Sequence, residues 1–489
     1  MKLTVLTGER TVVFEAERGK SLGRLFSMHG IHIPMRCGGN GTCGKCKVKL
    51  VEGRVSGAQP DAGGLVLACR AVPVSDCVIS VTEEKGRGLE GFRFARRPQP
   101  CHSGWGVAFD LGTTTLAACL VRLDDGEVVA RTSCLNPQAA FGSDVISRIG
   151  ACAEKENLAR QQKLINEKAA EMVRGLSAQA GGVHVSRMTV AGNTTMLHLF
   201  CGEDPTPIGV YPFTPAFLEE REYRGETLGI PADLIILLPS ISSYVGADIT
   251  AGILAADLAS SELPALLADL GTNGEMALVS GGKILCTSTA AGPALEGACI
   301  ECGVGGVKGA VNRVMCEDGK LTYSTIGNAP PVGLCGCGLV DFVACLLERG
   351  DLDETGYLEE EKISLTPEVW LSQADIRQYQ LAKSAVCAGM RALICKAGLR
   401  EEDVSRLLIA GGLGYYIDAE SAARTGLIPS GLKTRAEAVG NGSLYGAYLV
   451  LTDDKCRAEA REIAARCETV DLSSDAVFND EFIQGMMFE

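Results

Sequence analysis

The sequence has no excess of positive charge and few aromatic residues. Its 489 residues carry a formal net charge of −14, and aromatic residues make up 5% of the chain. Nucleic-acid backbones and anionic membrane surfaces attract basic proteins, so this charge argues against both as partners. No apolar run approaches about 18 residues and no signal-peptide pattern opens the chain. We therefore expect no membrane span, no secretion and a cytoplasmic location.

Histidine is scarce and cysteine is abundant. The chain has five histidines, none at a spacing typical of a metal or catalytic motif, so we predict no histidine chemistry and expect His198 to pack in a core. There are 21 cysteines. In a reducing compartment, cysteines serve more often as metal ligands or small buried hydrophobic residues than as disulfides. Clustering should therefore identify the cysteines that carry chemistry.

One dense cysteine cluster lies near the N-terminus. The stretch MRCGGNGTCGKC places Cys37, Cys43 and Cys46 on one glycine-rich loop, and Cys69 stands alone farther along the chain. Three thiolates on a loop and a distant fourth are typical of a [2Fe–2S] site. Zinc also binds four cysteines, but structural zinc sites usually pair two short knuckles. Residues 1–84 resemble the [2Fe–2S] ferredoxins, which implies a β-grasp fold, and Cys77 is expected in its core.

A basic, proline-containing stretch follows this domain. Residues 85–103 show no sustained hydrophobic period, which indicates a linker. Arg93, Arg96 and Arg97 could dock an acidic partner, but a solvated linker is the simpler interpretation.

Three glycine-rich turns after residue 104 indicate a phosphate-binding body. A β-rich run ends at Asp110 and enters a Gly-Thr-Thr-Thr turn, and the pattern recurs at Asp269 with Gly-Thr-Asn-Gly. Backbone N–H groups and hydroxyls of such turns can bind an anion, while the carboxylate can hold Mg²⁺ through water. Two copies predict an internal duplication facing one cleft. The residues of the three turns are Gly112, Thr113, Thr114, Gly271, Thr272, Asn273, Gly274, Gly411, Gly412 and Gly414.

The order of these turns resembles the phosphate-1, phosphate-2 and adenosine motifs of the ASKHA ATPases. The resemblance implies an α/β nucleotide-binding domain over residues 104–455, with two subdomains that bind ATP with Mg²⁺, followed by a C-terminal extension over 456–489. In that superfamily an acidic residue before phosphate-2 orients the attacking water, and Asp248 matches its position. Asp110, Asp248 and Asp269 are thus the catalytic candidates, although a helix-dipole role would also explain Asp248. Glu275 could support a bound metal.

Several longer stretches narrow the resemblance. NPQAAFGSDVISRI, VAGNTTMLHL, YVGADI, DLGTNGE and GCGLVD, behind a [2Fe–2S] domain, look like the RACE proteins, the reductive activators of corrinoid enzymes. This resemblance implies ATP-dependent one-electron reduction of cob(II)amide to cob(I)amide through the protein's own cluster. It also implies a corrinoid protein of a methyltransferase system as partner, a low-potential electron donor and, by family analogy, a homodimer. The tail holds only Cys456 and Cys467, too few for the [4Fe–4S] clusters of some members.

Other interpretations remain open from the sequence. One is an ATP-driven activator of the 2-hydroxyacyl-CoA dehydratase kind, although those hold a [4Fe–4S] cluster between two subunits. A kinase with a redox-sensing ferredoxin domain and a non-enzymatic nucleotide-binding module are the others. Cys299 with Cys302, and Cys335 with Cys337, could form a further redox or metal site, but burial beside glycine-rich turns explains them more simply.

Overall fold

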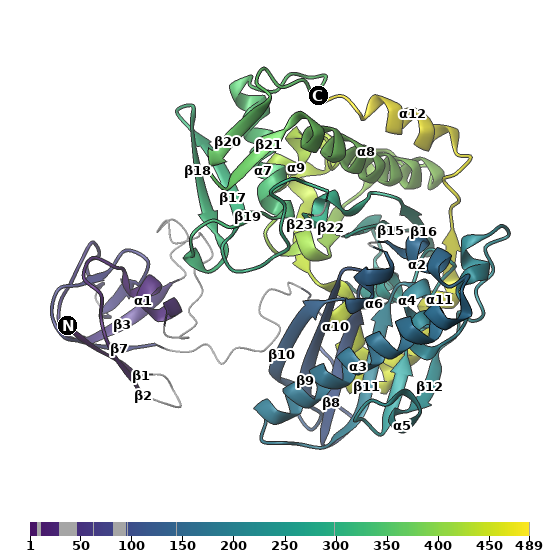
Figure 1. Ribbon diagram of the computed structural model, residues 1–489, viewed down its shortest axis with the longest axis horizontal. Helices are drawn as coiled ribbons and strands as arrows, with labels where there is room; N and C mark the ends of the chain where they lie inside the picture. The colour runs from purple at the N-terminus through teal and green to yellow at the C-terminus, as the bar shows by residue number, and fades with distance from the viewer. Residues whose placement is uncertain are drawn as a thin grey trace. The chain divides into compact units, whose positions relative to one another are not determined.

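The structure is a computed structural model of the chain. It describes residues 1–6, 11–28, 46–61, 63–81, 94, 96–142, 144–297 and 299–488. The chain divides into two compact units, the first made mainly of Met1–Arg87 and the second of most of the remaining residues (Figure 1).

The first unit is a mixed sheet covered by a helix. Its strands lie in the order β2-β1-β7-β3-β5, with β1 parallel to β7 and antiparallel to β2. Alternating residues of β1, Leu3 and Val5, are buried, and α1 packs Leu25 and Phe26 into the same core. Cys77 is 2% exposed in this core, as predicted. The elements are β1 (Lys2–Leu6), β2 (Thr11–Glu15), α1 (Leu22–Met28), β3 (Lys47–Glu52), β4 (Val55–Ser56), β5 (Leu65–Leu67), β6 (Val72–Pro73) and β7 (Cys77–Ser80).

The second unit contains two six-stranded sheets. The first has the order β10-β9-β8-β11-β13-β12 and the second the order β23-β22-β14-β15-β16-β24. The strands of the first are β8 (Trp105–Leu111), β9 (Thr115–Arg122), β10 (Glu127–Leu135), β11 (Val185–Gly192), β12 (Arg221–Arg224) and β13 (Leu234–Leu237). Those of the second are β14 (Ala265–Leu270), β15 (Gly274–Ser280), β16 (Lys283–Thr289), β22 (Arg406–Ala410), β23 (Ala436–Gly440) and β24 (Cys467–Thr469).

The two sheets share one topology. In each, a central strand forms an antiparallel meander with the next two strands (β8-β9-β10 and β14-β15-β16). On its other side the central strand is parallel to a later strand, β11 or β22, and a further parallel strand, β13 or β23, follows. Asp110 and Asp269 occupy the matching end of β8 and β14. This repeat confirms the predicted duplication and the ASKHA architecture.

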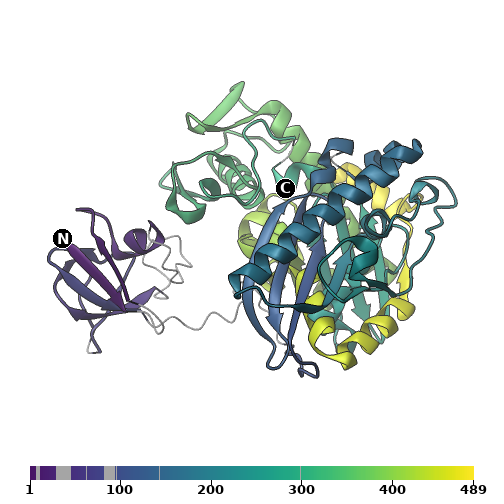
Figure 2. The ribbon, with the colours of Figure 1, turned by 60° about the horizontal axis from the view of Figure 1, so that its bottom comes forward.

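Helices surround the sheets and connect them (Figures 1 and 2). α3 packs on β9 and β10, α8 packs on β15 and β16, and α6 packs directly on α10. The longer helices are α2 (Val145–Ala151), α3 (Lys155–Gln179), α4 (Thr194–Cys201), α6 (Ala247–Ala255), α7 (Gly336–Arg349), α8 (Gln373–Lys396), α10 (Gly442–Thr452), α11 (Asp454–Arg466) and α12 (Ala476–Gln484). Among the described residues, every helix is too short or too polar to cross a bilayer.

Smaller elements complete the second unit. They are α5 (Gly225–Leu228), β17 (Ala310–Glu317), β18 (Lys320–Thr325), β19 (Gly333–Leu334), β20 (Lys362–Thr366), β21 (Val369–Ser372) and α9 (Ala419–Arg424). The residues expected as a C-terminal extension are integrated with this body. β24 pairs in parallel with β16, α11 packs on α6 and α10, and α12 packs on α8.

Part of the expected linker is bound to the body rather than solvated. We call residues 96–103 the strap. The Arg96 guanidinium donates to both carboxylate oxygens of Glu459, at 2.5 and 2.7 Å, and its side chain is 18% exposed. The backbone N–H of Gln99 donates to Asp453 Oδ2 at 3.0 Å, and that of Cys101 donates to the carbonyl of Thr452 at 3.1 Å. The strap therefore lies along the junction of α10 and α11.

The contact between α6 and α10 requires a glycine, which leads to a stability prediction. A Cβ at Gly446 would lie 2.2 Å from the carbonyl oxygen of Ala251 on the facing helix. Gly446→Ala is expected to lower the free energy of unfolding by about 1–3 kcal/mol, because the helices must separate to admit the methyl group. Chemical denaturation of the full chain measures this change. Gly175→Ala in α3 is the control, because its Cβ would meet no atom within 4 Å; equal destabilisation by both changes would contradict the prediction.

Candidate functional site

Two of the four predicted cluster ligands are brought together in the first unit. Cys46 lies just before β3 and Cys69 in the turn after β5, and their Sγ atoms are 3.2 Å apart. Cys46 is buried and Cys69 half-buried. Cys37 and Cys43 lie outside the described residues. Two thiols far apart in the sequence and adjacent in space fit the shared ligation of an iron–sulfur cluster.

The two predicted phosphate turns of the second unit meet directly. The hydroxyl oxygens of Thr114 and Thr272 are 3.0 Å apart. Both hydroxyls are within hydrogen-bonding distance of Glu296 Oε2, which lies 2.7 Å from Thr114 Oγ1 and is also contacted by Thr272 Oγ1. Glu296 ends a short 3₁₀ helix, η4 (Pro293–Glu296), that no sequence motif singled out. The two duplicated halves therefore bring a hydroxyl group each to the same place.

The first phosphate turn is held by buried polar side chains. Asn136 Nδ2 donates to the carbonyl of Gly112 at 2.9 Å, and Arg148 Nη2 donates to that of Thr113 at 2.7 Å. Arg148 is fully buried, and burial lowers its pKa to about 10. Asn136 and Arg148 belong to the NPQAAFGSDVISRI stretch, whose role the sequence alone did not reveal. Their hydrogen bonds position the turn.

Asp110 is anchored across the unit by the start of α10. Its two carboxylate oxygens accept hydrogen bonds from Asn441 Nδ2 at 2.6 Å and Ser443 Oγ at 2.7 Å. Burial nevertheless raises the pKa of Asp110, and the nearby Glu296 raises it further. Asn441 and Ser443 were not predicted, because their contact with Asp110 joins residues more than 300 positions apart.

The three predicted catalytic aspartates share one buried, acidic region. Burial raises the pKa of Asp248 to about 7, and the charge of Asp110 adds to this shift. Burial raises the pKa of Asp269 well above its usual range, with further contributions from Asp248 and Asp110. Buried carboxylates that repel one another are favourable ligands for a hard divalent cation. Perturbed carboxylates in one region are also typical of functional sites.

Glu275 joins the same region and connects it to α4. It is 7% exposed, and burial raises its pKa well above the usual range, followed by the charges of Asp248 and Asp269. Asn273 Nδ2 donates to Glu275 Oε1 at 3.1 Å, and Asn193, the N-cap of α4, lies 3.4 Å from the same oxygen. The VAGNTT stretch thus packs beside the second phosphate turn.

The third turn can approach the second closely because Gly411 has no Cβ. Gly411 has φ +84°, and a Cβ there would lie 2.5 Å from Asp269 Oδ1. A Cβ at Gly414 would lie 2.7 Å from the carbonyl oxygen of Ile409, whereas one at Gly412 would meet nothing within 4 Å. Close approach therefore requires glycine at the first and third positions and leaves open space at the second.

The raised pKa of Asp248 predicts a pH dependence. If Asp248 accepts a proton from the attacking water, its ionised form is the active one, and below about pH 7 the carboxyl is increasingly protonated. We therefore expect kcat/KM for ATP hydrolysis to rise with pH and to level off above about 7. A pH–rate profile of the full chain measures this rise. A rate that stays constant between pH 5 and 8, the range in which histidines also titrate, would contradict the prediction.

Of the remaining sequence candidates, His198, Cys302, Cys335 and Cys337 are buried. His198 Nδ1 lies 2.8 Å from the carbonyl of Thr194, its Nε2 accepts from the N–H of Ala216 at 3.0 Å, and its ring stacks on Phe217. Burial lowers its pKa, so His198 packs in the core as predicted. Cys302 lies 2.9 Å from the carbonyl of Trp370, and burial raises its pKa. Burial likewise raises the pKa values of Cys335 and Cys337. Cys299 is exposed, so the expectation that burial explains this cysteine was wrong.

The fold and site define an iron–sulfur domain joined in one chain to a duplicated ASKHA-type body. Family models divide the chain in the same way. Residues 6–74 match the 2Fe-2S iron–sulfur cluster binding domain, residues 105–261 the RACo middle region, and residues 264–489 the C-terminal domain of RACo, the ASKHA domain. The boundary between the last two falls between the two sheets. The chain belongs to the RACo family, the reductive activators of corrinoid proteins.

Individual relatives match most of the chain. The corrinoid activation enzyme RamQ of Eubacterium limosum is 32% identical over 418 residues, which cover 78% of this chain and 70% of that protein. The [Co(II) methylated amine-specific corrinoid protein] reductase of Methanosarcina barkeri is 26% identical, over 79% of this chain and 78% of the relative. A solved reductive activator for corrinoid, iron-sulfur protein matches with a TM-score of 0.75 at 28% identity, over 99% of this chain and 98% of the other.

Proposed function

We propose that this protein uses ATP to reduce an inactive cob(II)amide in a corrinoid protein to cob(I)amide by one electron. The observation that carries the proposal is the union, in one chain, of paired cluster thiols with phosphate turns lined by buried carboxylates. The names of the two relatives, a corrinoid activation enzyme and a Co(II) corrinoid protein reductase, support the same activity. The direct partner is then a corrinoid protein of a methyltransferase system.

Energetics explain why an ATPase accompanies the cluster. Ferredoxin-type [2Fe–2S] centres have potentials of about −400 mV or above, and the cobalt(II)/(I) couple of an inactive corrinoid is expected to be lower. For one electron, each deficit of about 59 mV disfavours transfer tenfold, or by about 1.4 kcal/mol. Binding to the oxidised corrinoid protein would raise the cobalt potential by changing its coordination. ATP hydrolysis would then separate the two proteins after the electron transfer. A nucleotide shifts the equilibrium between the bound and the separated state only as far as its affinities for the two states differ.

The chain's own residues divide the work. Cys37, Cys43, Cys46 and Cys69 would hold the [2Fe–2S] cluster, which supplies one-electron transfer. The hydroxyls of Thr114 and Thr272 would donate to the terminal phosphate of ATP, in place of their contacts with Glu296. Asp110 and Asp269 would hold Mg²⁺ through water.

Asp248 would accept the proton of the attacking water in this scheme. A low-potential donor, a cytoplasmic location and a homodimer belong to the same proposal.

Anaerobic spectroscopy tests this function. The protein, a low-potential reductant and a cob(II)amide protein are mixed with or without ATP, and cob(I)amide is followed by its visible absorption. We expect cob(I)amide only with ATP, and an ATPase rate that rises with the Co(II) partner but not with the same partner as Co(I). Equal stimulation by both forms would contradict the proposed mechanism. Phosphate transfer to a small molecule would instead support the kinase interpretation.

A further inference from the structure

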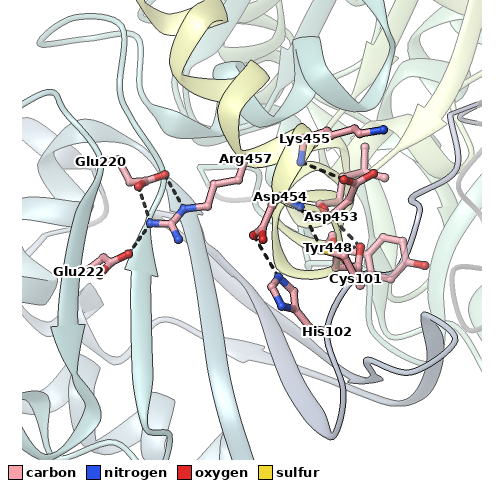
Figure 3. Close-up of polar contacts among 11 residues, drawn as sticks. Cys101, His102, Glu220, Glu222, Tyr448, Asp453, Asp454, Lys455 and Arg457 are labelled. Carbon is pink, nitrogen blue, oxygen red and sulfur yellow. Dashed lines mark hydrogen bonds and ion pairs between the residues drawn. The ribbon is translucent and has the colours of Figure 1, made fainter.

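Three metal-ligating side chains of different chemistry meet where the strap contacts α11. They are Cys101 and His102 on the strap and Asp454, the first residue of α11. One ligand atom from each lies within 4.8 Å of the other two. His102 Nε2 is 3.0 Å from Asp454 Oδ1, and Figure 3 shows the imidazole directed at this carboxylate with Cys101 beside them. This cluster belongs to neither the thiols of the first unit nor the phosphate turns.

The local hydrogen bonds hold these groups together. The backbone N–H of Asp454 lies 3.4 Å from Cys101 Sγ, and the Cys101 N–H donates to the Thr452 carbonyl at 3.1 Å. Backbone N–H donors to a sulfur are typical partners of metal thiolates. Both carboxylate oxygens of the neighbouring Asp453 already accept hydrogen bonds, from the backbone N–H groups of Gln99 and Lys455. Asp454 is therefore the carboxylate of this pair that is available to a metal.

Charge and exposure also suit a cation. Arg457 on α11 forms ion pairs with Glu220 and Glu222, so its charge is compensated. The side chain of Lys455, the other nearby cation, is directed away from His102 and Asp454 (Figure 3). The Asp454 side chain is 62% exposed and Cys101 is exposed, which leaves a path for a metal to enter and a position for water. A thiolate and an imidazole favour zinc over the hard cations Mg²⁺ and Ca²⁺. Three protein ligands leave the fourth tetrahedral position to a water, so this would be an open site rather than the closed four-ligand site of a zinc finger.

We propose that Cys101, His102 and Asp454 bind a zinc ion that fastens the strap to the start of α11. The strap leads into β8, whose end carries Asp110, and α11 follows α10, whose start holds Asp110 through Asn441 and Ser443. The zinc would therefore link the segment that enters β8 to the segment that follows α10, and β8 and α10 are the two elements that position Asp110. It is a stabilising site, and it takes no part in the chemistry at the phosphate turns.

Metal titration of the full-length, cluster-loaded protein tests the site. Zn²⁺ is added in competition with a chromophoric chelator, and Co²⁺ is added separately to detect thiolate-to-cobalt absorption. We expect one strong site in the native chain and an affinity at least about tenfold lower in Cys101→Ser, since even the loss of outer hydrogen-bond partners weakens metal sites by 10–100-fold. His102→Gln and Asp454→Asn are expected to act in the same direction.

Cys395→Ser is the matched control, because Cys395 is also an exposed thiol but lies on α8. The absorption of the iron–sulfur cluster must stay constant during the titration, which shows that zinc has not replaced iron. Zinc is also expected to raise the melting temperature of the native chain but not that of the Cys101→Ser variant. Equal zinc affinity in the native chain and Cys101→Ser, or no strong site in the native chain, would overturn the proposal and leave a simple His102–Asp454 hydrogen bond.

Discussion

Cys69→Ser is expected to abolish ATP-dependent formation of cob(I)amide while ATP binding is retained. Cys69 is the distant ligand, and its Sγ lies 3.2 Å from that of Cys46. A serine hydroxyl at this position is a poor substitute for a thiolate on iron, so the cluster would be lost or would change its potential. Electron paramagnetic resonance of the reduced protein measures the cluster, and visible absorption of the corrinoid partner measures the electron transfer.

Cys77→Ser is the control for this experiment. Cys77 is a buried cysteine of the same unit, but its Sγ contacts the carbonyls of Arg54 and Ser75 rather than another thiol. We expect this variant to keep the cluster signal and the activity. A normal [2Fe–2S] spectrum in Cys69→Ser, or equal loss of the cluster in both variants, would contradict the assignment of Cys69 as a ligand.

Asp248→Asn is expected to lower kcat for ATP hydrolysis by about 10²–10⁴-fold, the usual contribution of a general base. The amide keeps the shape of the side chain but cannot accept the proton of the attacking water. It also removes one of several mutually repelling carboxylates, so ATP affinity is expected to be unchanged or higher. Turnover with the Co(II) partner and binding by calorimetry separate these two effects.

Asp233→Asn is the matched control for Asp248→Asn. The Asp233 carboxylate is 62% exposed and pairs with His184 away from the phosphate turns. The Asp233→Asn variant is expected to hydrolyse ATP at the native rate. If Asp248→Asn also retains native turnover, Asp248 acts only as a charge near the start of α6, which is the helix-dipole role that its sequence position also allows.

Much of the site was predictable because its motifs are local. The turn residues after Asp110 and Asp269 are contiguous in sequence, and the duplication is visible as a repeated pattern. The side chains that hydrogen-bond to these turns and to Asp110 were not predictable in the same way. Glu296, Asn441 and Ser443 reach the turns from distant segments, and no spacing rule links residues across two sheets.

The prediction of a solvated linker was less successful, for a physical reason. Arg96 and Arg97 look like surface charges in a stretch without hydrophobic period. In the structure, Arg96 is paired with Glu459 and Arg97 donates to the hydroxyl of Tyr445. Composition alone cannot show that an acidic partner for the strap exists on a helix more than 300 residues away.

Local sequence motifs were sufficient to predict the two types of domain in this protein. Cysteine spacing indicated the [2Fe–2S] domain, and the repeated Asp-Gly-Thr turns indicated an ATP-binding body, because both depend on groups close together in the chain. Tertiary structure decided what surrounds them. Only folding buries Asp248 and Asp269 in one acidic region and raises their pKa values, since burial and mutual repulsion depend on contacts between segments. Only folding, likewise, brings Cys101 and His102 to Asp454.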